Sequence, residues 1–201
     1  MTGWQFWVDR GGTFTDVVAC TPQGHLKTLK LLSENPGQYQ DAVVYGIQKF
    51  LSASKSHVRE VDSVKMGTTV ATNALLQHRG EPTLLVITEG FRDALRIGYQ
   101  ERPDIFALDI RLPQMLYKEV AEVKERISAK GEIIRSLDEE ALQNSLMAAL
   151  DRGINSVAII LLHGYRFPQH EKRAAILARQ LGFKQVSVSH ETSPLMKLVT
   201  R

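Results

Sequence analysis

Apolar residues gather in three short runs at the start of the chain. Residues 4–8 and 17–21 are rich in aromatic and β-branched side chains, and residues 25–32 form the third run. Short runs of this composition are typical of β-strands. The glycine pair at 11–12 and the segment TPQG at 21–24 supply tight turns between the runs. The pattern therefore predicts an antiparallel meander of three strands.

Helical spacing of apolar residues begins after this meander. Apolar side chains recur at helical steps over residues 39–53, which predicts a helix. A short strand at 61–66 precedes a second helix, which Thr68 or Thr69 would cap and which Gly80 would end. The further predicted elements are a buried strand at 83–90, a helix at 91–98, a helix at 138–152, a buried strand at 156–164, a helix at 168–182 and a strand at 185–191.

Strands that alternate with helices pair in parallel and form a layered α/β sheet. Residues 99–113 carry two prolines and are predicted to form an excursion or loop. The segments 117–127 and 131–137 are predicted to be strands joined by SAKG. We treat residues 1–201 as one domain or a closely packed pair, and the abrupt end suggests a fragment of a longer chain.

Composition narrows the class of protein. The 201 residues carry 25 basic and 22 acidic side chains, a net charge of only +3, which gives no reason to expect a nucleic-acid or membrane partner. The single cysteine, Cys20, excludes an internal disulfide, and no apolar run reaches membrane-spanning length. We therefore expect a cytoplasmic protein in which Cys20 is a small buried hydrophobe.

The turn between the first two runs concentrates polar groups. It contains Asp9, Arg10, Gly11, Gly12, Thr13, Thr15 and Asp16. Adjacent glycines permit positive φ and close approach of a ligand, and successive amides can form an anion-binding concavity. The threonine hydroxyls can donate to phosphate, and Asp9 can hold Mg²⁺. The alternative is a type I′ hairpin turn without a ligand.

A second polar group lies between a predicted strand and a helix, where free amides attract anions. Gly67, Thr68, Thr69 and Asn73 belong to it. The hypothesis is that Thr68, Thr69 and Asn73 face a phosphate or the substrate. The alternative is an ordinary helix cap with Asn73 in solvent.

Several isolated residues have two interpretations each. Arg10 either stabilises transition-state charge or pairs with a surface acid. Arg92, Arg96 and Tyr99 either line a pocket for a carboxylate substrate or form a solvated helix face. His163 and Tyr165, at the end of a buried strand, lie where α/β proteins place ligands, although a satisfied core histidine is commoner. The histidines predicted to be at the surface are His57, His78 and His170.

The motif Asp-x-Gly-Gly-Thr-x-x-Asp after a strand resembles the first phosphate loop of the actin, sugar kinase and Hsp70 superfamily. The chain is also similar, over nearly its whole length, to the hydantoinase A and 5-oxoprolinase family. The blocks that carry this resemblance are DRGGTFTDVVA, LKLLSENP, MGTTVATNALLQHRGE, ITEGFRDALRIG and HGYRFPQHE. Arg10 and the segments 30–34, 116–127 and 193–201 look like the 5-oxoprolinase branch.

The resemblance implies a ribonuclease-H-like, actin-like ATPase domain: a mixed sheet that starts with the meander, with helices on both faces. It implies ATP-dependent opening of 5-oxo-L-proline to L-glutamate, with ATP and Mg²⁺ as cofactors and the downstream domains of the same polypeptide as partners. The implied catalytic residues are Asp9, Arg10, Thr68, Thr69 and Asn73. The implied phosphate-binding residues are Gly11, Gly12, Thr13, Thr15 and Asp16, with Asp9 at the metal.

The family also leaves alternatives open. A related ATP-dependent hydantoinase or ketone carboxylase subunit looks similar over this stretch, and the isolated chain is expected to be inactive. It would then be a non-catalytic binding module that depends on missing domains. We expect a homo-oligomer for the full-length protein.

Overall fold

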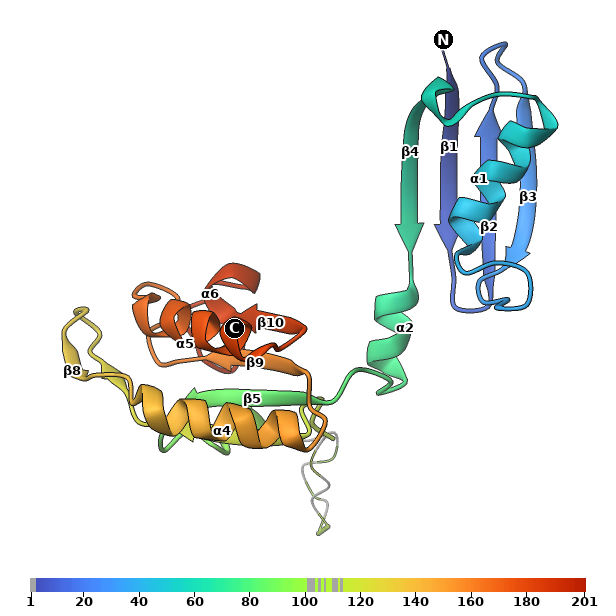
Figure 1. Ribbon diagram of the computed structural model, residues 1–201. Helices are drawn as coiled ribbons and strands as arrows, with labels where there is room; N and C mark the ends of the chain where they lie inside the picture. Colours follow the sequence, from blue (N-terminus) through green and yellow to red (C-terminus); the bar gives the residue numbers. More distant parts are fainter. Residues whose placement is uncertain (1–2, 101–103, 105, 107, 110–111, 113) are drawn as a thin grey trace. The chain divides into compact units, whose positions relative to one another are not determined.

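The computed structural model describes residues 3–100, 104, 106, 108–109, 112 and 114–201. The chain divides into two compact units, Met1–Arg79 and Gly80–Arg201 (Figure 1). Each unit has its own four-stranded sheet and its own hydrophobic core.

The sheet of the first unit has the strand order β3-β2-β1-β4. β1 (Trp4–Arg10), β2 (Phe14–Cys20) and β3 (Leu26–Leu32) pair in antiparallel fashion, so the predicted meander is confirmed. β4 (Val61–Thr68) pairs in parallel with β1. This parallel pairing brings the end of β4 beside the end of β1.

One helix covers the apolar face of this sheet. α1 (Ala42–Ala53) lies across the meander (Figure 1), where Leu51 packs against a buried cluster that includes Trp4, Phe6 and Val17. A single 3₁₀ turn, η1 (Val58–Glu60), precedes β4, and α2 (Val70–Leu76) follows it. α2 is shorter than predicted: it ends at Leu76, because the chain turns at His78, which has a left-handed φ of 51°, before Gly80 is reached.

The second unit contains an all-parallel sheet with the order β10-β9-β5-β6. Its strands are β5 (Thr83–Thr88), β6 (Glu119–Val123), β9 (Ser156–Ile160) and β10 (Gln185–Val188). Its helices are α3 (Ala94–Ile97), α4 (Glu139–Asp151), α5 (Gln169–Leu181) and α6 (Ser189–Thr192). The predicted alternation of strands and helices with parallel pairing is confirmed.

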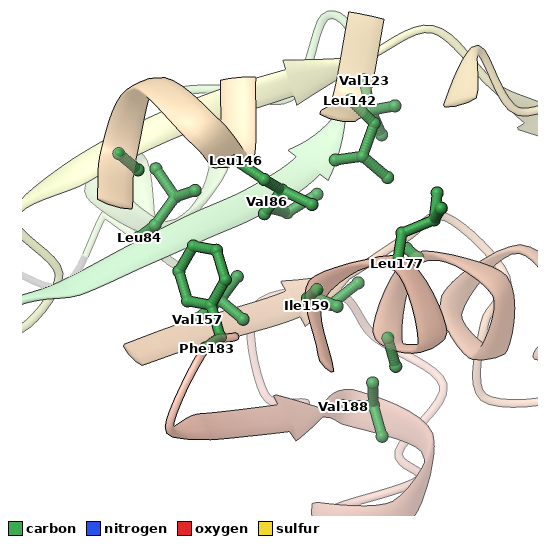
Figure 2. Packing of buried hydrophobic residues seen from close by; sticks show 14 of the residues in the cluster. Leu84, Val86, Val123, Leu142, Leu146, Val157, Ile159, Leu177, Phe183 and Val188 are labelled. Carbon is green, nitrogen blue, oxygen red and sulfur yellow. The ribbon is translucent and has the colours of Figure 1, made fainter. Parts of the chain in front are cut away.

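The central strand β5 is buried on both faces. Leu84 and Val86 belong to the core that α4 and α5 cover, which Figure 2 shows around Leu146. Leu85 and Ile87 belong to a second cluster on the opposite face. A strand with two buried faces needs apolar residues at successive positions, which explains its unbroken apolar sequence.

Helix ends in this unit follow the predicted signals. The Asp138 carboxylate caps α4 by accepting from the Ala141 amide at 3.0 Å. α5 begins after Pro168 and ends at Gly182, which takes a left-handed conformation with φ of 97°. Both features match the preference for proline at helix starts and glycine at helix ends.

The segment predicted as one strand at 117–127 is two strands in the structure. β6 ends at Val123, and β7 (Arg126–Ile127) forms a separate hairpin with β8 (Ile133–Arg135) through the SAKG turn. Polar Glu125 interrupts the pattern because it turns into the core instead of continuing β6. Most of the predicted excursion at 99–113, both prolines included, lies outside the described residues.

The predicted fold class is therefore confirmed: a mixed α/β fold whose first sheet is mixed and opens with an antiparallel meander. Within the described part of the chain, no helix has the length and apolar character needed to cross a membrane.

Candidate phosphate-binding site

The two polar groups singled out in the sequence lie side by side in the first unit. The register of β1 and β4 sets Arg10 opposite Thr68 and Asp9 opposite Gly67. The Arg10 carbonyl accepts hydrogen bonds from the Thr69 amide at 3.2 Å and from the Thr68 hydroxyl at 3.0 Å. Figure 1 shows the β1–β2 turn and the start of α2 at the same end of the sheet.

The turn itself leaves main-chain donors free. The Gly11 amide donates to the Phe14 carbonyl at 2.9 Å, which closes the hairpin. The amides of Gly12 and Thr13 have no hydrogen-bond partner among the residues that the structure describes. Two adjacent amides without partners at an exposed turn are available to an anion.

The glycine pair does not take the positive φ that adjacent glycines permit. Gly11 and Gly12 are absent from the residues with positive φ, so the turn is not of type I′, which requires it at both central positions. The glycines matter here for their missing side chains. A Cβ on Gly11 would approach the Phe14 carbonyl oxygen at 3.0 Å, and one on Gly12 would approach the Asn73 Nδ2 atom at 3.4 Å.

A buried pair of hydroxyls supports the turn from below. Ser33 donates its hydroxyl to the Gly11 carbonyl at 2.7 Å, and its amide donates to the Thr13 carbonyl at 2.8 Å. The Thr15 hydroxyl lies 2.9 Å from the Ser33 hydroxyl and is fully buried. The structure thus places Thr15 in the floor of the turn, while Thr13 is exposed on its outside.

Three charged side chains share the opposite face of the meander. Asp9 and Asp16 lie directly across from each other on β1 and β2, and Lys30 follows on β3. Lys30 binds Asp16 at 2.7 Å. Asp9 is exposed and has no side-chain partner among the described residues. Neighbouring carboxylates repel each other, so the unpaired Asp9 favours a cation at this face.

Arg10 pairs with an acid, as one of its two interpretations proposed. Its Nη1 atom lies 3.1 Å from the Asp41 carboxylate. Asp41 also caps α1 by accepting from the Val43 and Val44 amides, each at 2.9 Å. The hydrogen bond from the Val44 amide lowers the pKa of Asp41 from its ordinary value of 3.8, and the positive charge of Arg10 lowers it further. Partial burial of the carboxylate acts in the opposite direction.

The second group faces the turn through hydroxyl and amide side chains. The Thr68 hydroxyl accepts from the Val70 amide at 3.2 Å, so Thr68 and not Thr69 caps the start of α2 with its side chain. Thr69 is exposed, and its hydroxyl accepts from the Asn73 amide group at 3.4 Å. Asn73 is partly exposed, and its Nδ2 atom lies near Gly12.

The sequence did not single out Ser33, Lys30 or Asp41 for this site. Ser33 and Lys30 belong to the block at 30–34, which supported the family resemblance but was not assigned to the site. Asp41 immediately precedes an apolar helical pattern, which is an N-cap signal that could have located it.

The candidate site residues of the second unit lie in different local environments. Arg92 and Arg96 line a cavity, whereas Tyr99 is exposed and lies under Lys197. His163 is satisfied, with Nδ1 2.7 Å from the Ile127 carbonyl oxygen. Tyr165 lies under the guanidinium group of Arg201.

The surface prediction fails for one histidine. His57 and His78 are exposed, but His170 is buried and lies 2.7 Å from the Glu125 carboxylate. Glu125 also accepts from the Thr88 hydroxyl. His170 turns inward because this buried carboxylate needs a partner. Cys20 is buried, as predicted.

Comparisons with solved structures agree with this fold. The nucleotide-free structure of acetone carboxylase, from work on ATP-dependent acetone carboxylation, matches with a TM-score of 0.73 and 20% identity, over 96% of this chain and 30% of that chain. The ATP-dependent caprolactamase of Pseudomonas jessenii matches with a TM-score of 0.74 and 27% identity, over 98% of this chain and 30% of that chain. The class is thus the mixed α/β, actin-like fold predicted from the sequence.

Residues 5–182 match the model of the hydantoinase/oxoprolinase N-terminal region, and the chain belongs to that family. It is 41% identical to 5-oxoprolinase 1 of Arabidopsis thaliana over 98% of this chain and 18% of the relative. It is 31% identical to the acetophenone carboxylase gamma subunit of Aromatoleum aromaticum over 91% of this chain and 28% of that subunit. The chain thus spans less than a third of the curated relatives it matches.

Proposed function

We propose that this chain is the N-terminal, phosphate-binding region of an ATP-dependent enzyme that hydrolyses 5-oxo-L-proline to L-glutamate. One observation carries the proposal: the free amides of Gly12 and Thr13 lie beside Thr68 and Thr69 at adjacent ends of β1 and β4. The substrate is inferred from the 5-oxoprolinases among the relatives.

Each residue of the turn has a distinct role in this proposal. The amides of Gly12 and Thr13 and the Thr13 hydroxyl would donate to the terminal phosphate oxygens of ATP. Gly11 keeps the turn closed, while Thr15 supports it from within. Thr68, Thr69 and Asn73 would face the γ-phosphate or the substrate from α2, and Arg10 would leave Asp41 to stabilise transition-state charge.

The carboxylates fit a magnesium ion. Mg²⁺ in nucleotide sites commonly takes one or two carboxylates together with phosphate oxygens and water. Asp9 has an uncommitted carboxylate, and Asp16 lies directly across from it. When bound, Mg²⁺ would neutralise charge on the phosphates, while Asp9 holds it at the end of β1 and Asp16 supports the loop.

The chemistry explains the need for ATP. Hydrolysis of a five-membered lactam is unfavourable, so a phosphoryl group transferred from ATP to the amide oxygen, with ADP released, would activate the carbonyl carbon. Water would then add at that carbon, and the ring C–N bond would break as the nitrogen takes a proton, which leaves an acyl phosphate. A second water would hydrolyse this acyl phosphate to the carboxylate and inorganic phosphate. The residues of this chain would position the phosphates and offset their charge, which is most of the catalysis in phosphoryl transfer.

We further propose that residues 1–201 act with downstream domains of the same polypeptide, in a cytoplasmic homo-oligomer. The chain covers 18% of the oxoprolinase relatives, which leaves room for the loops that would hold adenosine. The isolated chain is therefore expected to bind ATP weakly and to hydrolyse neither ATP nor 5-oxo-L-proline.

The binding step is tested on the 201-residue chain by calorimetric titration with ATP, with and without Mg²⁺. Asp9→Ala is expected to weaken MgATP binding about tenfold or more, since it removes a charged ligand of the cation. The matched control is Asp151→Ala, at the exposed end of α4 in the other unit. Equal affinities for wild type and Asp9→Ala would refute the proposed site.

The reaction is tested on the full-length polypeptide by phosphate release. Stimulation by 5-oxo-L-proline that is lost in Asp9→Ala supports the proposal, whereas stimulation by hydantoins supports the related hydantoinase. The acetophenone carboxylase relative makes a ketone carboxylase the second candidate, for which acetophenone with bicarbonate is the test. No stimulation by any of these leaves a non-catalytic binding module.

A further inference from the structure

A cavity of about 600 Å³ lies in the second unit, far along the sequence from the β1–β2 turn. Residues around α3 form one side of it, and the segment that enters β6 forms the other. Its volume lies within the range of small-molecule pockets. The lining residues that bear on the choice of ligand are Arg92, Arg96, Met115, Tyr117, Lys118 and Val120.

Positive charge is in excess in this cavity. Arg92, Arg96 and Lys118 line it together with two acids, Asp93 and Glu119. The Glu119 carboxylate is already held by two hydrogen bonds from Arg152, at 2.6 and 3.0 Å, and these hydrogen bonds lower the pKa of Glu119. Only Asp93 is left to oppose three cations.

These three cationic side chains also have no ion-pair partner among the described residues. Among the described residues, Arg92, Arg96 and Lys118 make no ion pair with an acid, and Arg92 makes only a long hydrogen bond of 3.4 Å to the Val120 carbonyl. Like charges gathered in a concave surface attract anions and raise their local concentration. Arginine adds a planar pair of donors that matches a carboxylate.

The rest of the lining selects for an organic anion. Met115, Tyr117 and Val120 are partly buried and offer apolar surface beside the cations. We propose that this cavity binds a small organic carboxylate, with the carboxylate on Arg92 and Arg96 and a compact ring or chain against the apolar wall. The choice of a lactam carboxylate as first probe rests on the proposed function, while the cavity and its charge do not.

The test titrates the 201-residue chain with 5-oxo-L-proline, with cyclopentanecarboxylate, with uncharged 2-pyrrolidinone and with inorganic phosphate, followed by calorimetry and by NMR shifts. At least one carboxylate is expected to bind about tenfold or more tightly than 2-pyrrolidinone, because the neutral ring lacks the group that the arginines recognise. Phosphate is expected to bind more weakly than that carboxylate, since it gains nothing from the apolar wall.

Variants locate the binding. Arg96→Gln is expected to weaken carboxylate binding about tenfold, and Arg96→Lys less, because it keeps the charge but loses the planar donor pair. Arg179→Gln, at the exposed end of α5, is the matched control and is expected to leave binding unchanged. Dispersed NMR spectra of each variant would verify that it is folded.

The outcomes separate this inference from the proposed function. Failure of both carboxylates to bind, equal binding of 2-pyrrolidinone, or equal losses in Arg96→Gln and Arg179→Gln would overturn the cavity proposal, even with MgATP binding intact. Conversely, carboxylate binding that depends on Arg96 would stand if Asp9→Ala left MgATP affinity unchanged, and the phosphate site alone would then be refuted.

Discussion

At the scale of single residues, the β1–β2 turn depends on a serine that is remote in sequence. Ser33 contacts the turn three times, through the Gly11 carbonyl, the Thr13 carbonyl and the Thr15 hydroxyl. Ser33 is 5% exposed and Thr15 is fully buried, so water cannot replace these hydrogen bonds easily. The position of the free amides is thus fixed from inside the unit.

Replacing Ser33 tests this support. Ser33→Ala leaves the Thr15 hydroxyl without its buried partner and is expected to lower the free energy of unfolding by about 1–3 kcal/mol. Urea denaturation of the 201-residue chain measures the change, and MgATP affinity should fall with it. Ser52→Ala, on the exposed side of α1, is the control and should stay within about 0.5 kcal/mol of wild type. Equal effects of both changes would contradict the role of Ser33.

At the scale of elements, Asp41 joins the start of α1 to the end of β1. One oxygen of its carboxylate caps α1 and the other holds Arg10 at the end of β1. If Arg10 moves toward a phosphate, the cap stays in place, because it uses the other oxygen. α1 is therefore a fixed support from which Arg10 can be released.

Separate substitutions distinguish the cap from the ion pair. Asp41→Ala is expected to cost about 0.5–2 kcal/mol of unfolding free energy, whereas Asp41→Asn keeps a capping oxygen and should cost less. The Arg10 pair is only partly buried, with side chains 31% and 39% exposed, and it is expected to contribute about 1 kcal/mol or less by itself. Urea denaturation midpoints at neutral pH would rank the variants by stability. Gln48→Ala, on the exposed face of α1, is the control. An asparagine variant as unstable as the alanine variant would assign the effect to the charge.

The same cap predicts a pH dependence. The folded pKa of Asp41 is lowered from 3.8, so its contribution is present above that pH and is lost as the pH falls through the lowered value. The difference in stability between wild type and Asp41→Asn should therefore be constant at neutral pH and shrink below pH 3.8. Urea denaturation at a series of pH values measures it, and a difference that persists undiminished in acid would contradict the role of the charge.

At the scale of the complete chain, two separate cores stabilise the two units. The first is built on Trp4, Phe6 and Val17, and the second on β5, β9 and the helices that cover them. Because the clusters share no residues, loss of packing in one core leaves the contacts of the other unchanged. We therefore expect the units to open independently.

Core truncation with hydrogen exchange tests this independence. Leu146→Ala, at a position that is 0% exposed, is expected to destabilise the second unit by about 2–5 kcal/mol. Amides of α4, α5 and β9 should then exchange faster while those of β1 to β3 keep their rates. Phe6→Ala is the reciprocal change and should give the opposite pattern. Faster exchange in both units from either substitution would show that they open together.

The local elements and the chemical character of the turn could be predicted from the amino-acid sequence alone. Runs of β-branched and aromatic residues, helical spacing, and the signals at Asp138, Pro168 and Gly182 act within a few residues, so they indicate the order of strands and helices. The motif around Gly11 and Gly12 likewise predicts anion binding and indicates the family.

Which distant groups meet depends on the folded chain. Three contacts join residues that are 22 to 45 positions apart: Ser33 with Gly11, Asp41 with Arg10, and Glu125 with His170. The periodicity of the sequence does not predict such pairings. The sequence also does not predict the division of the strands into two sheets. A strand pattern indicates that a segment pairs with another strand, but it does not identify the partner strand. Local propensity acts between neighbours in the chain, whereas burial and hydrogen bonding act between neighbours in space.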